Sequence, residues 1–150
     1  MWSDLVTLTI VISVLSSTVR IATPLLLAAL GELMTERTGV LNLGVEGTML
    51  MGAWVGFLVT ERTGSLIFGI GGALAIGLLF SLVMAFMGVT LELDQVVVGL
   101  GINLLASGLS FYWYRVSYQI KGVINTPTID TLPLAKIPFL SEIPIIGRIV

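Results

Sequence analysis

The sequence contains a stretch of 29 consecutive residues without a charged side chain, from Thr63 to Leu91. As an α-helix rising about 1.5 Å per residue, this stretch would reach about 43 Å, more than the roughly 30 Å of bilayer hydrocarbon. A soluble protein could bury so apolar a helix only in a large core, and a chain of 150 residues has no core of that size. The stretch therefore predicts an integral membrane protein whose surroundings include the lipid bilayer.

The composition agrees and argues against several functional classes. Hydrophobic residues make up 56% of the chain and charged residues 11%, against about 25% charged residues in an ordinary soluble domain. The net charge of −2 predicts no nucleic-acid partner. The absence of Cys and His excludes metal sites and catalytic triads built on them, and no Walker A pattern occurs. We assign no catalytic residue, no metal ligand and no cofactor, and we do not expect an enzyme.

Charged residues divide the apolar sequence into segments, which predict an all-α, polytopic helical bundle. Some segments are shorter than a full span and require charged side chains near the membrane surface. We expect a short N-terminal helix at 4–18, four spans and a C-terminal segment with little regular structure, in which prolines interrupt helices. The predicted spans lie near 19–36, 46–60, 64–90 and 95–114, and the Pro-rich segment covers 116–150. The cluster at 111–115, four aromatic residues followed by Arg115, predicts an interfacial belt that closes the last span.

A Gly-rich stretch precedes the second predicted span. Gly39, Gly44 and Gly47 weaken a continuous helix there, and Asn42 and Glu46 supply polar side chains. Irregular backbone at membrane depth persists only when it is buried in protein or lines a polar cavity, so such a break can mark a transport path. The alternative is a structural role, in which Glu46 stabilises the N-terminus of the following helix.

Other polar and small residues lie within the apolar segments. Asn103 interrupts the 95–114 span, where it either lines a pathway or makes an interhelical hydrogen bond. Gln95 is better explained as an interfacial residue of the first turn. Gly52 and Gly56 form a small-xxx-small pair, which favours close helix packing.

Three stretches resemble the permease subunits of bacterial ABC importers, in the superfamily of ribose and branched-chain amino-acid permeases. Residues 24–53 read PLLLAALGELMTERTGVLNLGVEGTMLMGA, and the part ERTGVLNLGVEG is most similar to the nucleoside and simple-sugar subgroup. Supporting stretches are DQVVVGLGINLLASGLS at 94–110 and PFLSEIPIIG at 138–147. Together they cover most of the chain, in the order that the family has them.

The resemblance implies a multi-pass permease in the bacterial cytoplasmic (inner) membrane that translocates nucleosides or simple sugars. It implies three protein partners: a cytoplasmic ATPase that hydrolyses ATP, an extracytoplasmic substrate-binding protein, and a second permease that is identical or homologous. It also places the Gly-rich break near the translocation path, which assigns path candidates by motif. These are Asn42, Leu43, Gly44, Glu46 and Gly47.

The chain departs from the family in length, since family permeases are about twice as long with a second half that repeats the first. We therefore expect an N-terminal half, either a fragment or a truncated product. The family pattern places 116–150 outside the cell, although the Lys and Arg residues there oppose the positive-inside tendency. Two alternatives remain open: a small accessory or structural membrane protein, and half of a secondary transporter.

Overall fold

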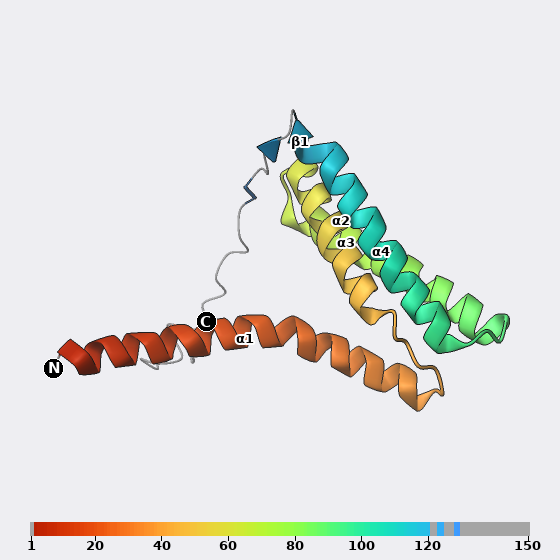
Figure 1. The fold of residues 1–150 in the computed structure, drawn as a ribbon, viewed down its shortest axis with the longest axis horizontal. Helices are drawn as coiled ribbons and strands as arrows, with labels where there is room; N and C mark the ends of the chain where they lie inside the picture. Colours follow the sequence, from red (N-terminus) through yellow and green to blue (C-terminus); the bar gives the residue numbers. More distant parts are fainter. Residues whose placement is uncertain (1, 121–122, 125–127, 130–150) are drawn as a thin grey trace. The chain divides into compact units, whose positions relative to one another are not determined.

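The computed structural model describes residues 2–120, 123–124 and 128–129, with side chains described for 9–118 and 128–129. Helix α1 covers Trp2–Arg37, α2 Val45–Thr63, α3 Leu66–Ala85 and α4 Gln95–Tyr118. A π-helical turn, η1, covers Phe86–Thr90 and continues α3 (Figure 1). Two short strands, β1 (Gln119–Ile120) and β2 (Val123–Ile124), pair antiparallel. The predicted all-α, polytopic fold is confirmed, since the longer described elements are all helices.

The chain divides into two compact units, the first containing residues 2–30 of α1 and the second residues 31–131. The sequence predicted a helix at 4–18 and a separate span at 19–36, whereas α1 is one continuous helix of 36 residues. Pro24 lies inside it. Thr23 Oγ1 donates a hydrogen bond of 2.7 Å to Val19 O, an i−4 carbonyl. The single proline therefore does not end α1, because its apolar surroundings favour continued backbone pairing.

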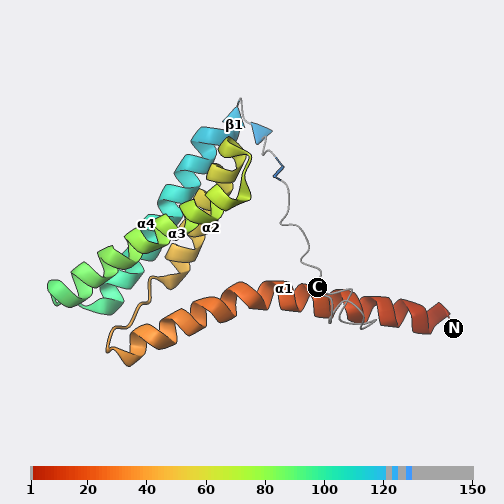
Figure 2. The ribbon, with the colours of Figure 1, turned by 180° about the vertical axis from the view of Figure 1, so that it is seen from behind.

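In the second unit, α2, α3 and α4 lie side by side, as both ribbon views show (Figures 1 and 2). Helix α2 packs against both others, and its Met51 is 1% exposed. The close approach to α3 occurs at Gly56 and Gly69, where a Cβ added to Gly69 would lie 2.8 Å from Gly56 O. Gly52 is less tightly packed, with Ala73 O at 3.9 Å from a Cβ at that position.

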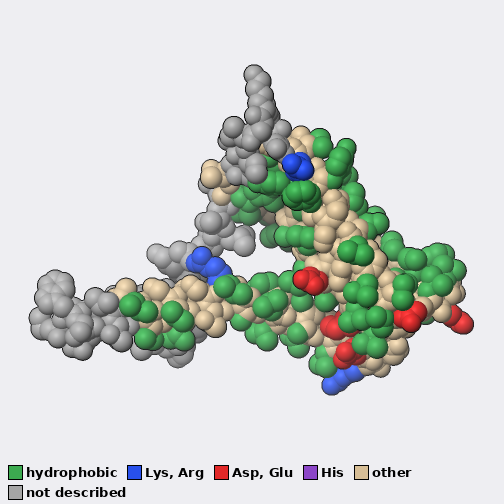
Figure 3. Space-filling model, in the orientation of Figure 1, with side chains coloured by type: hydrophobic (Ala, Val, Ile, Leu, Met, Phe, Trp, Pro, Cys, Tyr) green, Lys and Arg blue, Asp and Glu red, His purple; other side chains and the backbone are tan. Residues whose placement is uncertain are grey.

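Three of the described helices are long and apolar enough to cross a membrane: Thr9–Arg37, Leu66–Thr90 and Gln95–Tyr118. Their outward faces are covered with hydrophobic side chains (Figure 3), as lipid-facing helices require. Helix α2 has 19 residues, with Glu46 in its first turn and Glu61 and Arg62 near its end. The span at 46–60 stays a prediction.

The turn between α3 and α4 and the end of α4 determine the limits of the last helix. Asp94 Oδ1 accepts hydrogen bonds from Val96 N at 2.9 Å and Val97 N at 3.3 Å, which caps the N-terminus of α4. At the other end α4 continues to Tyr118, past the expected end at 114, so the cluster at 111–115 lies within the helix. Most of the Pro-rich segment 116–150 lies outside the described residues.

Candidate functional site

Residues 38–44 form a non-helical segment between α1 and α2, which we call the α1–α2 break. Helix α1 ends where Gly39 adopts a φ of 85°, a left-handed conformation that favours glycine. Gly39 N donates to Glu36 O at 2.9 Å, and Val40 N donates to Thr35 O at 3.2 Å. The chain then leaves helical geometry until Val45, so several of its backbone polar groups need partners from other parts of the protein.

Side chains supply the missing hydrogen bonds within the break. Gln95 Oε1 accepts from Leu41 N at 2.7 Å, and Glu32 Oε1 accepts from Asn42 N at 2.8 Å. The Asn42 side chain turns back on its own backbone, and its Oδ1 accepts from Gly44 N at 3.1 Å. The unwound backbone is thus bound by polar groups from the end of α1, from itself and from the start of α4.

Asn103 forms the fourth connection, from the middle of α4. Its Oδ1 accepts from Gly47 N at 2.7 Å, and its Nδ2 donates to Leu43 O at 2.9 Å. One amide therefore binds the break and the first turn of α2 together. Both amide atoms bond to protein, so the interhelical hydrogen bond that the sequence left open as one alternative is present.

Glycines allow α4 to pack directly on this backbone. A Cβ added to Gly99 would lie 2.9 Å from both Gly44 N and Leu43 C, and one added to Gly47 would lie 2.9 Å from Asn103 Cα. Distances below 3.0 Å are essentially never seen for real Cβ atoms. The break can thus approach α4 only because these positions have no side chain.

Glu46 follows the break, and its side chain is exposed. It lies in the first turn of α2, where a negative charge interacts favourably with the helix dipole, but the N-cap of α2 is Gly44 and has no side-chain cap hydrogen bond. Glu46, Gly47 and Asn103 line one cavity of about 420 Å³ between α2 and α4. The structure therefore brings three predicted path residues together, while Asn42 and Gly44 lie outside the lining of that cavity.

Sequence reasoning missed three residues of this site: Glu32, Gln95 and Gly99. Glu32 lay near the end of the predicted 19–36 span with no role assigned, and Gln95 was predicted as an interfacial residue of a first turn. For Glu32 and Gln95 a signal was available, because each is a polar side chain beside a long apolar segment, where an unsatisfied polar group is costly. For Gly99 no sequence pattern identified the backbone against which it packs.

Aromatic side chains meet at the other end of the α2–α4 pair. The Trp54 ring lies edge-to-face against Tyr114 at 5.9 Å and against Tyr118 at 5.8 Å, measured between ring centroids. Tyr118 Oη donates to Glu61 Oε2 at 3.0 Å. A second cavity of about 660 Å³ lies beside these rings and shares Leu50 and Ser107 with the first cavity.

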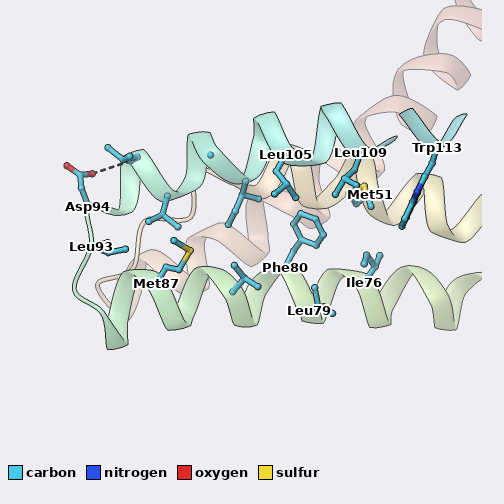
Figure 4. Close-up of a pocket in the computed structure, with 15 residues that line it drawn as sticks. Met51, Ile76, Leu79, Phe80, Met87, Leu93, Asp94, Leu105, Leu109 and Trp113 are labelled. Atoms are coloured by element: carbon cyan, nitrogen blue, oxygen red, sulfur yellow. Dashed lines mark hydrogen bonds between the residues drawn. The ribbon is translucent and has the colours of Figure 1, made fainter. Parts of the chain in front are cut away.

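A third cavity, of about 820 Å³, lies between α3 and α4 and is almost wholly apolar. Figure 4 shows Phe80 of α3 and Leu105 of α4 reaching toward each other across it. Among the residues that the structure describes, no group of three or more acidic side chains could hold a metal ion. The polar side chains that line cavities are therefore found mainly between α2 and α4.

Comparison with known proteins shows which sequences are similar to this chain. The family described as "Branched-chain amino acid transport system / permease component" matches residues 14–144. A putative glucose ABC transporter permease protein of Haloferax volcanii is 39% identical over 134 residues, which cover 89% of this chain and 40% of the relative. The guanosine ABC transporter permease protein NupQ of Bacillus subtilis is 35% identical over 142 residues, covering 91% of this chain and 44% of the relative.

A third relative, the nucleoside ABC transporter permease protein NupC of Lactococcus lactis, is 34% identical over 134 residues, covering 85% of this chain and 41% of the relative. The chain thus spans 40–44% of the length of these three relatives. No solved structure matches the chain.

Proposed function

The chain belongs to the family of branched-chain amino acid transport system permease components, and on that premise we propose that it acts as a permease subunit of an ABC importer for nucleosides or simple sugars. Family membership and three apolar helices make it a multi-pass protein of the inner membrane. The proposed substrate class is supported by the names of the relatives, which specify glucose, guanosine and nucleosides. Permease components of this family are transporter subunits, and we infer that this chain translocates its substrate without changing it chemically.

The observation that contributes most to this proposal is the α1–α2 break. Unwound backbone in a membrane protein is stable only where it is buried in protein or lines a water-filled cavity. Here the backbone is held by Glu32, Gln95 and Asn103, and a cavity with an exposed Glu46 lies beside it. Discontinuous helices of this kind are used by transporters to place polar groups near the bilayer midplane.

We infer that the translocation path passes the break, with Glu46, Gly47 and Asn103 forming its wall. Glu46 would supply a hydrogen-bond acceptor to substrate hydroxyl groups, and Gly47 would leave room beside it. Asn42 and Gly44 would act behind the wall by maintaining the backbone conformation, since Asn42 Oδ1 binds Gly44 N. Gly52 and Gly56 would contribute to helix packing, where Gly56 already approaches α3 closely.

ATP hydrolysis would be the task of a separate subunit, because the sequence contains no Walker A pattern. The proposed assembly contains a cytoplasmic ABC ATPase, an extracytoplasmic substrate-binding protein and a second permease, identical or homologous. The Pro-rich segment 116–150 would face the extracytoplasmic side, where it could contact the binding protein.

The test is uptake of radiolabelled nucleosides and monosaccharides by vesicles that contain the full-length permease with its ATPase and binding protein. We expect uptake to require ATP on the cytoplasmic side of the vesicle membrane and to stop when the ATPase loses its catalytic residue. Uptake should persist when proton and sodium gradients are collapsed. Uptake that follows an ion gradient without ATP would identify a secondary transporter instead. Absence of uptake of both substrate classes, in an assembly with active ATPase, would refute the proposal.

A further inference from the structure

The two cavities beside α2 and α4 adjoin each other, because Leu50 and Ser107 line both, and we call the pair the groove. At one end lie Glu46 and Asn103. At the other end lies Trp54, in the wall of the second cavity. Glu46 and Trp54 are eight residues apart on one helix, which corresponds to about 12 Å along its axis.

Hydrogen-bond acceptors predominate in the polar lining of the groove. Ser107 Oγ already donates its proton to Asn103 O at 2.8 Å, and Ser110 Oγ donates to Ser107 O at 3.1 Å. Each hydroxyl oxygen therefore offers lone pairs but no proton to a bound molecule. With the Glu46 carboxylate, they form a row of acceptors suited to a ligand with several hydroxyl or amino donors.

The aromatic end of the groove offers ring surface. Phe111, in the wall of the second cavity, is 62% exposed, so part of its ring is open to a bound molecule. Trp54 is 8% exposed, and its Nε1–H is buried without an acceptor among the described residues. Because that nitrogen is buried even with the cavity empty, the aromatic end contributes ring surface and no donor from Trp54.

We propose that this groove is a nucleoside-binding site on the permease, which extends the proposed function by naming the ligand and rests on it. The ribose lies toward Glu46 and Ser107, whose acceptors pair with its hydroxyl groups. The base lies toward the aromatic end, stacked on Phe111. A separation of about 12 Å between the polar and aromatic ends matches a ligand with distinct sugar and base parts better than a single sugar ring.

Two matched pairs of variants in the full-length permease test this site. Phe111→Ala is compared with Tyr112→Ala, because the two side chains are adjacent and each is 62% exposed, but Tyr112 lines none of the three cavities described above. Ser107→Ala is compared with Ser81→Ala, an exposed serine on α3. The measurement is ATP-driven nucleoside uptake per assembled transporter at saturating binding protein, so that the rate reports on the permease. Assembly is quantified by co-purification of the ATPase.

We expect the two groove variants to lower nucleoside uptake about 3- to 10-fold, as loss of one hydrogen bond or one stacking contact predicts. The two controls should stay within about twofold of the unmodified permease. We also expect the unmodified transporter to discriminate between a ribonucleoside and its 2′- or 3′-deoxy analogue, and Ser107→Ala to reduce this discrimination. A merely structural serine would lower uptake of both compounds equally.

The outcomes separate this inference from the proposed function. If the unmodified assembly imports nucleosides but Phe111→Ala and Ser107→Ala behave like their controls, the groove is not the site, while the importer function stands. Import of monosaccharides with no import of nucleosides also overturns the nucleoside site and leaves the importer function intact. No ATP-driven uptake of either class refutes the proposed function itself.

Discussion

Replacement of Asn103 by leucine is the sharpest test of how the α1–α2 break is stabilised. Leucine has the same number and branching of side-chain heavy atoms, so the change removes two hydrogen bonds while it keeps the outline of the side chain. Gly47 N loses its acceptor at 2.7 Å and Leu43 O loses its donor at 2.9 Å. Hydrogen bonds between membrane helices contribute roughly 0.6–1.7 kcal/mol each, so the two together predict a loss of about 1–3 kcal/mol.

The assay is unfolding of the purified full-length permease in lipid bicelles or mild detergent, followed by helical circular dichroism and by cysteine accessibility. Ser107→Ala is the matched control, because Ser107 lies one turn further along α4 and its hydroxyl bonds only to a carbonyl of its own helix. We expect this control to change the free energy of unfolding by no more than about 0.5 kcal/mol. If Asn103→Leu and Ser107→Ala unfold alike, the Asn103 bonds do not stabilise the break and the reasoning is wrong.

Three further predictions concern neighbouring positions. Gly99→Ala should lower the free energy of unfolding by about 1–3 kcal/mol, because its Cβ would lie 2.9 Å from Gly44 N. Gly101→Ala is the control, because position 101 faces open space. Equal free energies of unfolding for the two variants would contradict the close approach. Gly44→Val and Glu46→Ala should reduce uptake more than they reduce the amount of assembled complex, and unchanged uptake in both variants would leave the break with only a packing role. Asp94→Ala should lower the free energy of unfolding by about 1 kcal/mol, because the N-terminus of α4 loses its cap. The same unfolding assay measures this change, and an unchanged free energy would show that the cap is dispensable.

The elements that the sequence predicted well are those that depend on local physics. The uncharged stretch from Thr63 to Leu91 largely matches α3 and η1, because hydropathy and length are properties of consecutive residues. Helix α4 begins at Gln95, as expected, because Asp94 is a favourable cap next to it. The glycines at 39–47 marked where helical geometry stops, since the left-handed φ at Gly39 follows from residue type.

The remaining features depend on contacts between residues distant in sequence. Leu41 N and Gln95 Oε1 are 54 positions apart, and no local pattern specifies that pair. The continuity of α1 was missed for a different reason: the charge of Arg20 divides the apolar sequence, but the helix continues through that residue. Close packing at Gly99 likewise requires knowledge of which backbone lies opposite.

A structural role and a transport role for the break need not exclude each other, because different side chains supply them. Both atoms of the Asn103 amide bond to backbone groups, so its principal effect should be on stability. The Glu46 carboxylate is exposed in a cavity, and the described residues give it no hydrogen-bond or ion-pair partner. A charge left unpaired beside apolar helices is costly unless water or a solute reaches it. Asn103→Leu should therefore change unfolding, and Glu46→Ala should change uptake while leaving unfolding nearly unaltered. The reverse assignment would mean that Glu46 supports the helix and that the path runs elsewhere.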